Sequence, residues 1–162
     1  MLAAAEGEAA ALPKEGDLFV AAGKTRGKPL TSRDIRLGAR PVIAYAMDPK
    51  TGVVRNGSRL NQVLLLRLDP QKLSPETTSR AVDGIVAYSA ICTHTGCDVS
   101  EWLGGDRLLL CPCHFSTFDP ADGARVADGV APRPLPALPL ALDRGRLRIA
   151  GPFTSDVGFE PA

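Results

Sequence analysis

Every cysteine and every histidine of the chain lies in two short segments, and this clustering constrains the fold more than any other feature. The first segment reads Cys-Thr-His-Thr-Gly-Cys over residues 92–97, and the second reads Cys-Pro-Cys-His over residues 111–114. Thiolates and neutral imidazoles both bind transition metals, and metal binding to such segments is coupled to folding. We therefore expect the two segments to meet in space around a metal centre.

Each segment supplies one thiolate and one imidazole to this predicted site. Cys92 and Cys111 would bind one iron of a two-iron, two-sulfide cluster. His94 and His114 would bind the other iron. Because two neutral imidazoles replace two thiolates, the surroundings are less negative, which favours the reduced cluster and raises its reduction potential.

The two remaining cysteines lie one in each segment. Cys97 and Cys113 can clamp the segments together if their Cα atoms come within about 7 Å of each other. Such a clamp would leave the other four groups free to bind the metal centre.

The two segments, extended to Cys-Pro-Cys-His-Phe-Ser-Thr-Phe-Asp in the second case, resemble those of the Rieske proteins of quinol-oxidising cytochrome bc complexes and their bacterial relatives. The resemblance covers roughly residues 83–150. It implies an all-β Rieske fold, in which an antiparallel base domain carries a small inserted cluster-binding subdomain. It also implies one 2Fe–2S cluster per chain and a disulfide between Cys97 and Cys113. Rieske domains of ring-hydroxylating oxygenases usually lack that disulfide, so the resemblance is to the respiratory proteins.

A structural zinc site is the alternative interpretation of the same residues. Mixed sets of four cysteine and histidine ligands bind zinc as readily as iron. Zinc would leave two cysteines without a role, whereas a cluster with a disulfide uses all four cysteines and both histidines. The sequence therefore favours the iron–sulfur interpretation.

Three residues near the second segment are assigned from the same resemblance. Ser116 matches a serine whose hydroxyl donates to a bridging sulfide, and Phe118 stands where many bc-type members have a tyrosine that donates to a ligand sulfur. Donors to sulfur raise the reduction potential, so we expect this chain to have one of the two donors and to lack the other. Pro132 belongs to segment 129–134, which resembles the proline-rich loop that covers the cluster.

The function implied by the resemblance is one-electron transfer from quinol to a cytochrome. The chain would be the iron–sulfur subunit of a complex containing cytochromes of the b and c types, with His94 and His114 in contact with quinol and able to accept its proton. The chain alone is not expected to oxidise quinol. An alternative follows from Phe115 and Phe118, which make the second segment similar to the small subunit of arsenite oxidases. That likeness implies an electron relay for a molybdenum oxidoreductase.

Charge and hydropathy limit the other partners and the location. Nineteen basic and eighteen acidic residues leave a net charge of +1, which provides no patch for nucleic acid. A persistent disulfide indicates an oxidising compartment, so we expect the chain on the periplasmic or extracytoplasmic face. No apolar stretch approaches the roughly 18 residues of a membrane helix. We expect a soluble fragment of a protein whose N-terminal membrane anchor lies outside this sequence.

The rest of the chain predicts one domain with a tail. We assign residues 1–16 to a linker or tail and 17–162 to the Rieske domain, with the cluster-binding subdomain at about 90–132. Apolar and β-branched runs predict strands at 18–22, 40–47, 60–68, 84–90, 108–110 and 115–119, and a hairpin of 136–142 with 146–150. Ser74 and Pro75 indicate the start of a helical turn. Trp102 is expected to cover the small core of the subdomain.

Overall fold

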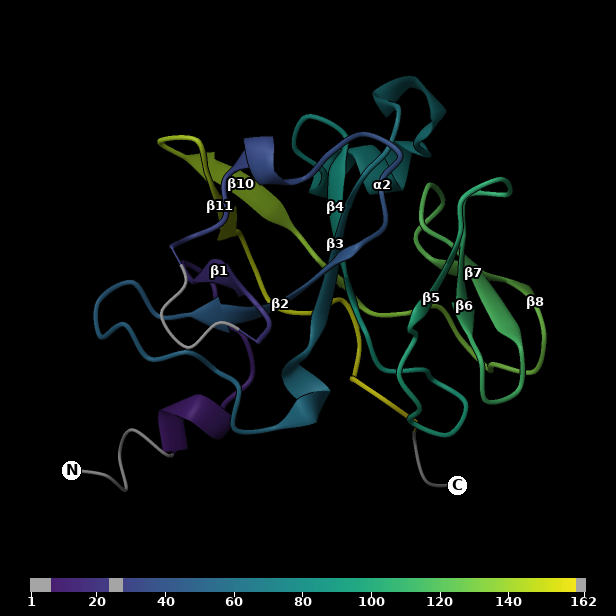
Figure 1. Ribbon diagram of the computed structural model, residues 1–162, viewed down its shortest axis with the longest axis horizontal. Helices are drawn as coiled ribbons and strands as arrows, with labels where there is room; N and C mark the ends of the chain where they lie inside the picture. Colours follow the sequence, from purple (N-terminus) through teal and green to yellow (C-terminus); the bar gives the residue numbers. More distant parts are fainter. Residues whose placement is uncertain (1–6, 24–27, 160–162) are drawn as a thin grey trace.

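The computed structural model describes residues 7–23 and 28–159, and this part of the chain forms two antiparallel sheets (Figure 1). The large sheet has seven strands in the order β10-β11-β1-β2-β3-β4-β9. They are β1 (Leu18–Ala21), β2 (Val42–Met47), β3 (Val63–Arg67), β4 (Ile85–Ser89), β9 (Ala137–Leu138), β10 (Leu140–Asp143) and β11 (Arg146–Ile149). The small sheet has four strands in sequence order: β5 (Glu101–Leu103), β6 (Leu108–Cys111), β7 (Ser116–Asp119) and β8 (Arg125–Asp128). The predicted all-β fold, a base sheet with an inserted smaller one, is confirmed.

The large sheet curls into a nearly closed barrel. β9 and β10 are its two outer strands, yet only Pro139 separates them in the sequence, so the two edges of the sheet must meet. The carbonyl of Pro139 accepts a hydrogen bond of 2.8 Å from the backbone N–H of Ala150, just beyond β11. The barrel interior is filled by one cluster of buried apolar side chains, which includes Phe19, Val63, Leu65, Ile85, Leu147 and Ile149.

β3 and β4 separate two hydrophobic cores. In β3, Val63 and Leu65 point into the barrel, whereas Leu64 and Leu66 join the core shared with the small sheet. The same alternation in β4 places Val86 and Tyr88 against the small sheet. Because successive side chains of a strand point to opposite faces, burial of both faces requires the continuous apolar runs that these strands have.

Several predicted strands begin later than expected, and for β3 and β7 the local cause is clear. Residues 60–62 were expected in the strand, but Arg59–Asn61 form a 3₁₀ turn (η2) before β3. The side-chain oxygen of Ser58 accepts a hydrogen bond of 3.2 Å from the N–H of Leu60, which favours this turn over an extended chain. Phe115 was expected in β7, but its φ of +60° lies in the left-handed region, which a strand residue does not adopt. Phe115 is therefore the last residue of the preceding loop, and β7 begins at Ser116.

The helical turn and the tryptophan are confirmed. α2 (Pro75–Arg80) has Ser74 as its N-cap, and the Ser74 hydroxyl accepts a hydrogen bond of 3.3 Å from the N–H of Thr77. Trp102 is half-buried and packs against the core between the two sheets. Two further 3₁₀ turns, η1 (Ser32–Asp34) and η3 (Pro70–Lys72), connect the strands of the base domain.

Residues 7–16 lie against the barrel. Arg55, whose side chain is 2% exposed, forms an ion pair of 2.7 Å with Asp17 and donates to the carbonyl of Glu8 at 3.0 Å. The hydrogen bond to Asp17, and then the nearby carboxylates, raise the pKa of Arg55 against the effect of its burial, so the pair stays charged. Residues 1–6 of the predicted tail lie outside the described residues. In the described part of the chain, none of the helices is long and apolar enough to cross a membrane.

Candidate metal centre

Residues 92–97, which we call the first cluster loop, close on themselves just after β4. The N–H of Cys92 donates to the carbonyl of Cys97 at 2.8 Å, and the N–H of Gly96 donates to the carbonyl of Cys92 at 3.1 Å. Gly96 has a φ of +79°, which favours glycine. The Cys92 sulfur is buried inside this turn and accepts a hydrogen bond of 3.5 Å from the N–H of His94.

Residues 111–116, the second cluster loop, connect β6 to β7. Cys111 and Ser116 are opposite each other in the sheet, and both are buried. The four residues between them, Pro112, Cys113, His114 and Phe115, are exposed. This loop therefore has a buried base and a tip that faces the surroundings.

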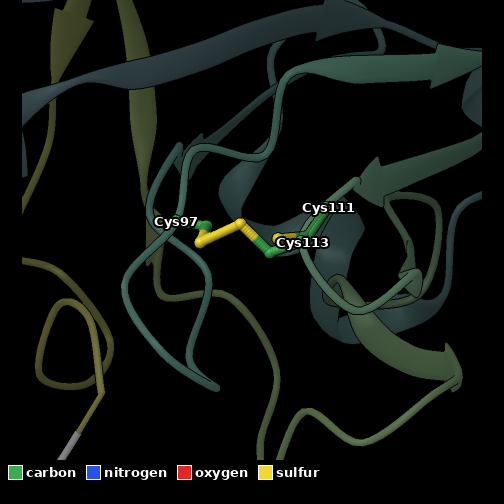
Figure 2. Close-up of side chains that lie close together, drawn as sticks. All are labelled: Cys97, Cys111 and Cys113. Carbon is green, nitrogen blue, oxygen red and sulfur yellow. A yellow bond between two sulfur atoms is a disulfide. The ribbon is translucent and has the colours of Figure 1, made fainter.

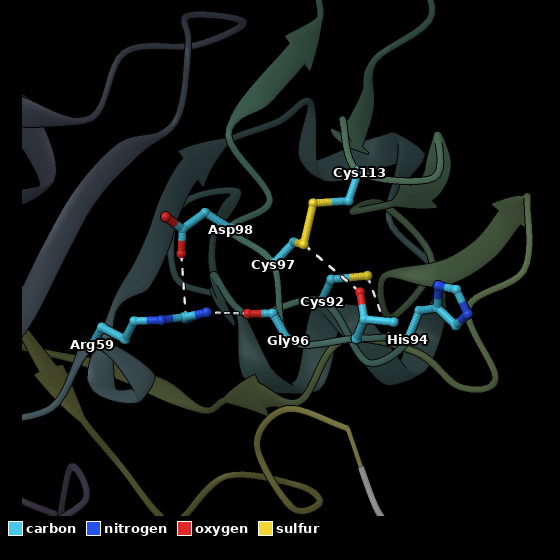
Figure 3. Close-up of a disulfide and its surroundings, with 8 residues drawn as sticks. Arg59, Cys92, His94, Gly96, Cys97, Asp98 and Cys113 are labelled. Atoms are coloured by element: carbon cyan, nitrogen blue, oxygen red, sulfur yellow. Dashed lines mark hydrogen bonds and ion pairs between the residues drawn. A yellow bond between two sulfur atoms is a disulfide. The ribbon is translucent and has the colours of Figure 1, made fainter.

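The predicted disulfide is confirmed. Cys97 and Cys113 are bonded, with their Cα atoms 6.5 Å apart, and this bond joins the two cluster loops (Figure 3). The Cys111 sulfur lies within 4.8 Å of the sulfurs of both bonded cysteines (Figure 2). Those two sulfurs are already bonded to each other, so this trio is not a metal site. The free thiols are Cys92 and Cys111, both buried.

The two loops bring their imidazoles next to each other, and each loop also holds one buried free thiol. The imidazole rings of His94 and His114 have centroids 4.7 Å apart and lie nearly perpendicular, at 79°. Burial raises the pKa of the Cys111 thiol, and the adjacent Cys92 thiol raises it further, while the backbone N–H groups of Cys113 and His114 act against this shift. Cys92 and Cys111 belong to the same buried cluster of side chains between the two sheets.

One buried atom at this site has no hydrogen-bond partner among the described residues. His94 Nδ1 is buried and accepts no hydrogen bond from any described residue. A buried polar atom without a partner costs free energy unless something else satisfies it. A metal would satisfy this nitrogen and would also deprotonate the two buried thiols. The residues present thus fit a centre with two thiolate and two imidazole ligands, and their assignment as ligands remains a prediction.

Ser116 and Phe118 differ in what they can donate. The Ser116 oxygen accepts a hydrogen bond of 3.1 Å from the N–H of Ala131, so the proton of its buried hydroxyl is still available for donation. Phe118 is fully buried in the core between the two sheets and has no donor. The predicted donor role of Ser116 is compatible with this geometry, and it remains a prediction.

Segment 129–134 bridges the two cluster loops. At one end Gly129 lies so close to Ser116 that an added Cβ would fall 2.5 Å from the Ser116 Cα, so only glycine fits here. Further along, the carbonyl of Arg133 accepts a hydrogen bond of 2.7 Å from the buried hydroxyl of Thr93. Pro132 lies between these contacts and is exposed.

Three residues at the site carry contacts that the sequence did not predict. Thr93 holds the first cluster loop to segment 129–134, as described above. The Arg133 side chain donates to the carbonyl of Gly158, which ties the C-terminal segment to the site. The Arg59 side chain donates to the carbonyl of Gly96. For Arg133, the flanking prolines at 132 and 134 indicate a fixed backbone and could have drawn attention to it.

Comparison with known proteins decides the family. The Rieske [2Fe-2S] domain family matches residues 42–139, which is more than half of the chain. The chain belongs to the Rieske family. The cofactor of that family is a 2Fe–2S cluster, so the zinc interpretation is set aside.

Two curated relatives and one solved structure are similar to this Rieske chain. The "Cytochrome bc1 complex Rieske iron-sulfur subunit" of Streptomyces lividans is 44% identical over 137 residues, which is 81% of this chain and 79% of that protein. The "Putative respiratory nitrate reductase subunit Rieske" of Haloferax mediterranei is 48% identical over 82 residues, 50% of this chain and 36% of that protein. A structure titled "Hyperthermophilic respiratory Complex III" is 24% identical, with a TM-score of 0.48 over 73% of this chain and 70% of that chain.

Proposed function

We propose that this Rieske chain transfers single electrons as the iron–sulfur subunit of a quinol-oxidising, cytochrome bc-type complex. The observation that carries the proposal is the similarity to the Streptomyces lividans bc1 subunit, which extends over most of both chains. The two cluster loops support it, because they hold two buried free thiols and two adjacent imidazoles, the donor types that a Rieske 2Fe–2S cluster needs.

The residues of the site would divide the work by burial. A 2Fe–2S cluster supplies the one-electron acceptor and donor. Cys92 and Cys111 would hold it from the protein interior, where their side chains are 1% and 2% exposed. His94 and His114 would hold it from outside. Because His114 is exposed, its second ring nitrogen can reach a quinol and accept a proton from it.

The surrounding segments would control access to the site. The disulfide ties the exposed tip of the second cluster loop to the first, and segment 129–134 is hydrogen-bonded to both loops. The disulfide and segment 129–134 together would exclude water from the buried sulfurs. Exclusion of water would strengthen the hydrogen bonds that backbone N–H groups donate to these sulfurs. The natural partners on this proposal are quinol, a cytochrome of the b type and one of the c type.

The location belongs to the same proposal. A structural disulfide persists in an oxidising compartment, so the site would face the periplasm or another extracytoplasmic space. We propose that a membrane anchor outside this sequence holds the chain beside its partners.

A second function is favoured by a specific observation. The Haloferax mediterranei relative is named as a Rieske subunit of a respiratory nitrate reductase, and its similarity is confined to half of this chain. The aromatic Phe115 and Phe118 already indicated a relay role for a molybdenum oxidoreductase such as arsenite oxidase. On this alternative the ligands are unchanged and only the partner subunit differs.

The proposal is tested in two steps. The purified chain should contain two irons and two acid-labile sulfides, and its reduced form should give a Rieske-type paramagnetic resonance spectrum. The full-length protein should then be isolated from native membranes and its co-purifying subunits identified. Haem b and quinol-dependent cytochrome c reduction support the bc-type assignment, whereas a molybdopterin subunit without haem b would replace it with the relay. Stoichiometric zinc without sulfide would contradict both.

A further inference from the structure

Arg59 reaches from the base domain to the first cluster loop. It lies in η2, directly before β3, and its guanidinium donates to the carbonyl of Gly96 and forms an ion pair of 3.5 Å with Asp98 (Figure 3). Gly96 and Asp98 stand on either side of Cys97. A single planar guanidinium therefore holds the chain on both sides of the disulfide-bonded cysteine, as its forked set of donors allows.

The grip on Gly96 continues to Cys92. The N–H of Gly96 donates to the carbonyl of Cys92, and the N–H of Cys92 donates to the carbonyl of Cys97. These two bonds close the loop through Gly96 and Cys97, so the Arg59 guanidinium holds the same short segment whose N–H and carbonyl groups fix the backbone of Cys92. The Cys92 sulfur in turn accepts from the N–H of His94 at 3.5 Å.

We propose that Arg59 is a positioning residue for the cluster: it holds the first cluster loop closed from the base domain and so fixes the direction of the N–H groups around the Cys92 sulfur. This inference rests on the proposed ligand role of Cys92. On this proposal, a residue outside both cysteine–histidine segments, Arg59, contributes to the reduction potential of the cluster. Hydrogen bonds to a ligand sulfur favour the reduced cluster, so a loosened loop should lower the reduction potential.

The exposure of Arg59 makes the inference testable without damage to the core. Its side chain is 52% exposed and that of Asp98 is 56% exposed, so an exposed ion pair alone would contribute little to stability. The hydrogen bond to the Gly96 carbonyl is part-buried and has a charged donor, so it is less screened by water than the exposed ion pair. Loss of Arg59 should therefore act on the loop and not on the fold.

The variants are Arg59→Ala and Arg59→Lys, with Arg146→Ala as a matched control. Arg146 forms a comparable surface ion pair with Asp143, at 3.0 Å and 37% exposure, in the β10–β11 hairpin. A lysine keeps the charge but cannot hold both sides of Cys97 through one planar group, so it should rescue only part of the effect.

The first measurement is hydrogen exchange of the peptide that covers residues 92–97, made on the cluster-loaded protein. In Arg59→Ala the amides of Cys92 and Gly96 should exchange about tenfold faster, as expected for loss of a hydrogen bond to a charged group. Arg59→Lys should lie between this variant and the wild type, and Arg146→Ala should match the wild type. The second measurement is the midpoint potential, which should fall in Arg59→Ala and stay unchanged in the control.

Several outcomes would overturn the inference. Exchange at 92–97 that is unchanged in Arg59→Ala would mean that the loop closes without this residue. Equal shifts in the potential for Arg59→Ala and Arg146→Ala would mean a general charge effect. If Arg59→Ala does not accumulate as folded protein, Asp98→Asn replaces it; that variant leaves the bond to Gly96 in place and should give a smaller increase in exchange, and no increase at all would count against the inference. A complex from native membranes that lacks haem b and quinol-dependent cytochrome c reduction would contradict the proposed function but leave the exchange result standing.

Discussion

The two cluster loops contain the same kinds of candidate ligand but are held in different ways. The first loop is closed by its own backbone hydrogen bonds and is tied to two other parts of the chain, by the contact of Thr93 with Arg133 and by that of Gly96 with Arg59. The second loop has its four central residues exposed, and the disulfide from Cys113 fastens its tip to the first loop. The comparison teaches that the first loop is ordered by its own hydrogen bonds, whereas the tip of the second loop is held in place by one covalent bond to the first.

The difference in burial matches a difference in task. The first loop places His94 half-buried, with its Nδ1 enclosed. The second loop places His114 and Phe115 outward, where a substrate or partner can touch them. A loop that must meet a partner needs exposed side chains, and a loop that must hold a metal needs fixed ones. We therefore expect the first loop chiefly to hold the metal centre and the second loop chiefly to contact a partner.

The largest expected effect is the loss of one imidazole. His114→Ala and His94→Ala should each abolish the native cluster, because each histidine is one of two nitrogen ligands on the proposed site. Iron and sulfide analysis with paramagnetic resonance measures this. Since His114 is exposed, His114→Ala should keep the circular dichroism of the wild-type protein. Two irons and two sulfides with an unchanged spectrum in either variant would refute the ligand assignment.

The next effect is removal of the covalent link between the loops. Replacing both Cys97 and Cys113 by serine should lower the free energy of unfolding by about 3 kcal/mol, the value expected for a closed loop of this length. Denaturant unfolding measures the loss. Hydrogen exchange should rise more in the second cluster loop than in the first, because the first keeps its other ties. An equal increase in hydrogen exchange in the two cluster loops would contradict the view that the first loop is held independently of the disulfide.

A smaller effect is expected at the base of the second loop. Ser116→Ala should lower the midpoint potential by about 40 mV, since one hydrogen bond to the reduced cluster is lost and only the difference between the redox states, about 1 kcal/mol, counts. Protein film voltammetry measures the shift. Thr117→Val is the matched control, because the Thr117 hydroxyl is also buried but has no hydrogen-bond partner among the described residues. A potential unaffected by Ser116→Ala would exclude the donor role.

The smallest effect concerns Phe115. A phenylalanine at a φ of +60° costs about 1–2 kcal/mol. Glycine avoids that cost, but it loses more backbone conformational entropy on folding, which costs about 0.5–1 kcal/mol. Phe115→Gly should therefore raise the free energy of unfolding by about 0.5–1 kcal/mol, a net value from the same two terms. Thermal unfolding checks it. Phe115→Ala should show no gain, because alanine keeps the left-handed cost. A gain of the same size in both variants would show that the exposed ring, and not the backbone, is the source.

The central strands and the site were predictable for a common reason. β2, β3 and β4 are apolar, β-branched runs whose side chains fill the two cores, so burial leaves a direct mark on the sequence. The site was predictable because all its candidate ligands lie in two compact motifs. In both cases the information is local, and a short window of sequence contains it.

The remaining elements depend on distant contacts. β5 and β8 are short and neither contains a fully buried residue, and they form because they pair with β6 and β7 at the edges of the small sheet. The contacts of the two arginines at the site are also remote in sequence: Arg59 meets Gly96 37 positions away, and Arg133 meets Gly158 25 positions away. An arginine in a turn has the same local sequence whether it faces solvent or holds a loop, so only the tertiary structure identifies these two.

The connection between the barrel and the small sheet has a consequence for how such proteins diversify. β4 and β9 pair with each other, and the N–H of Ser89 donates to the carbonyl of Pro136 at 2.9 Å, so the chain leaves the barrel and returns to it at one hydrogen-bonded point. Everything between residues 90 and 135 is therefore a cassette whose two ends are already neighbours. Mutation can reshape the electron-carrying surface, its length and its charge without any change in the path of the barrel strands. Selection can therefore act on the redox properties largely within residues 90–135, while the disulfide and the shared core connect the stability of this segment to that of the barrel.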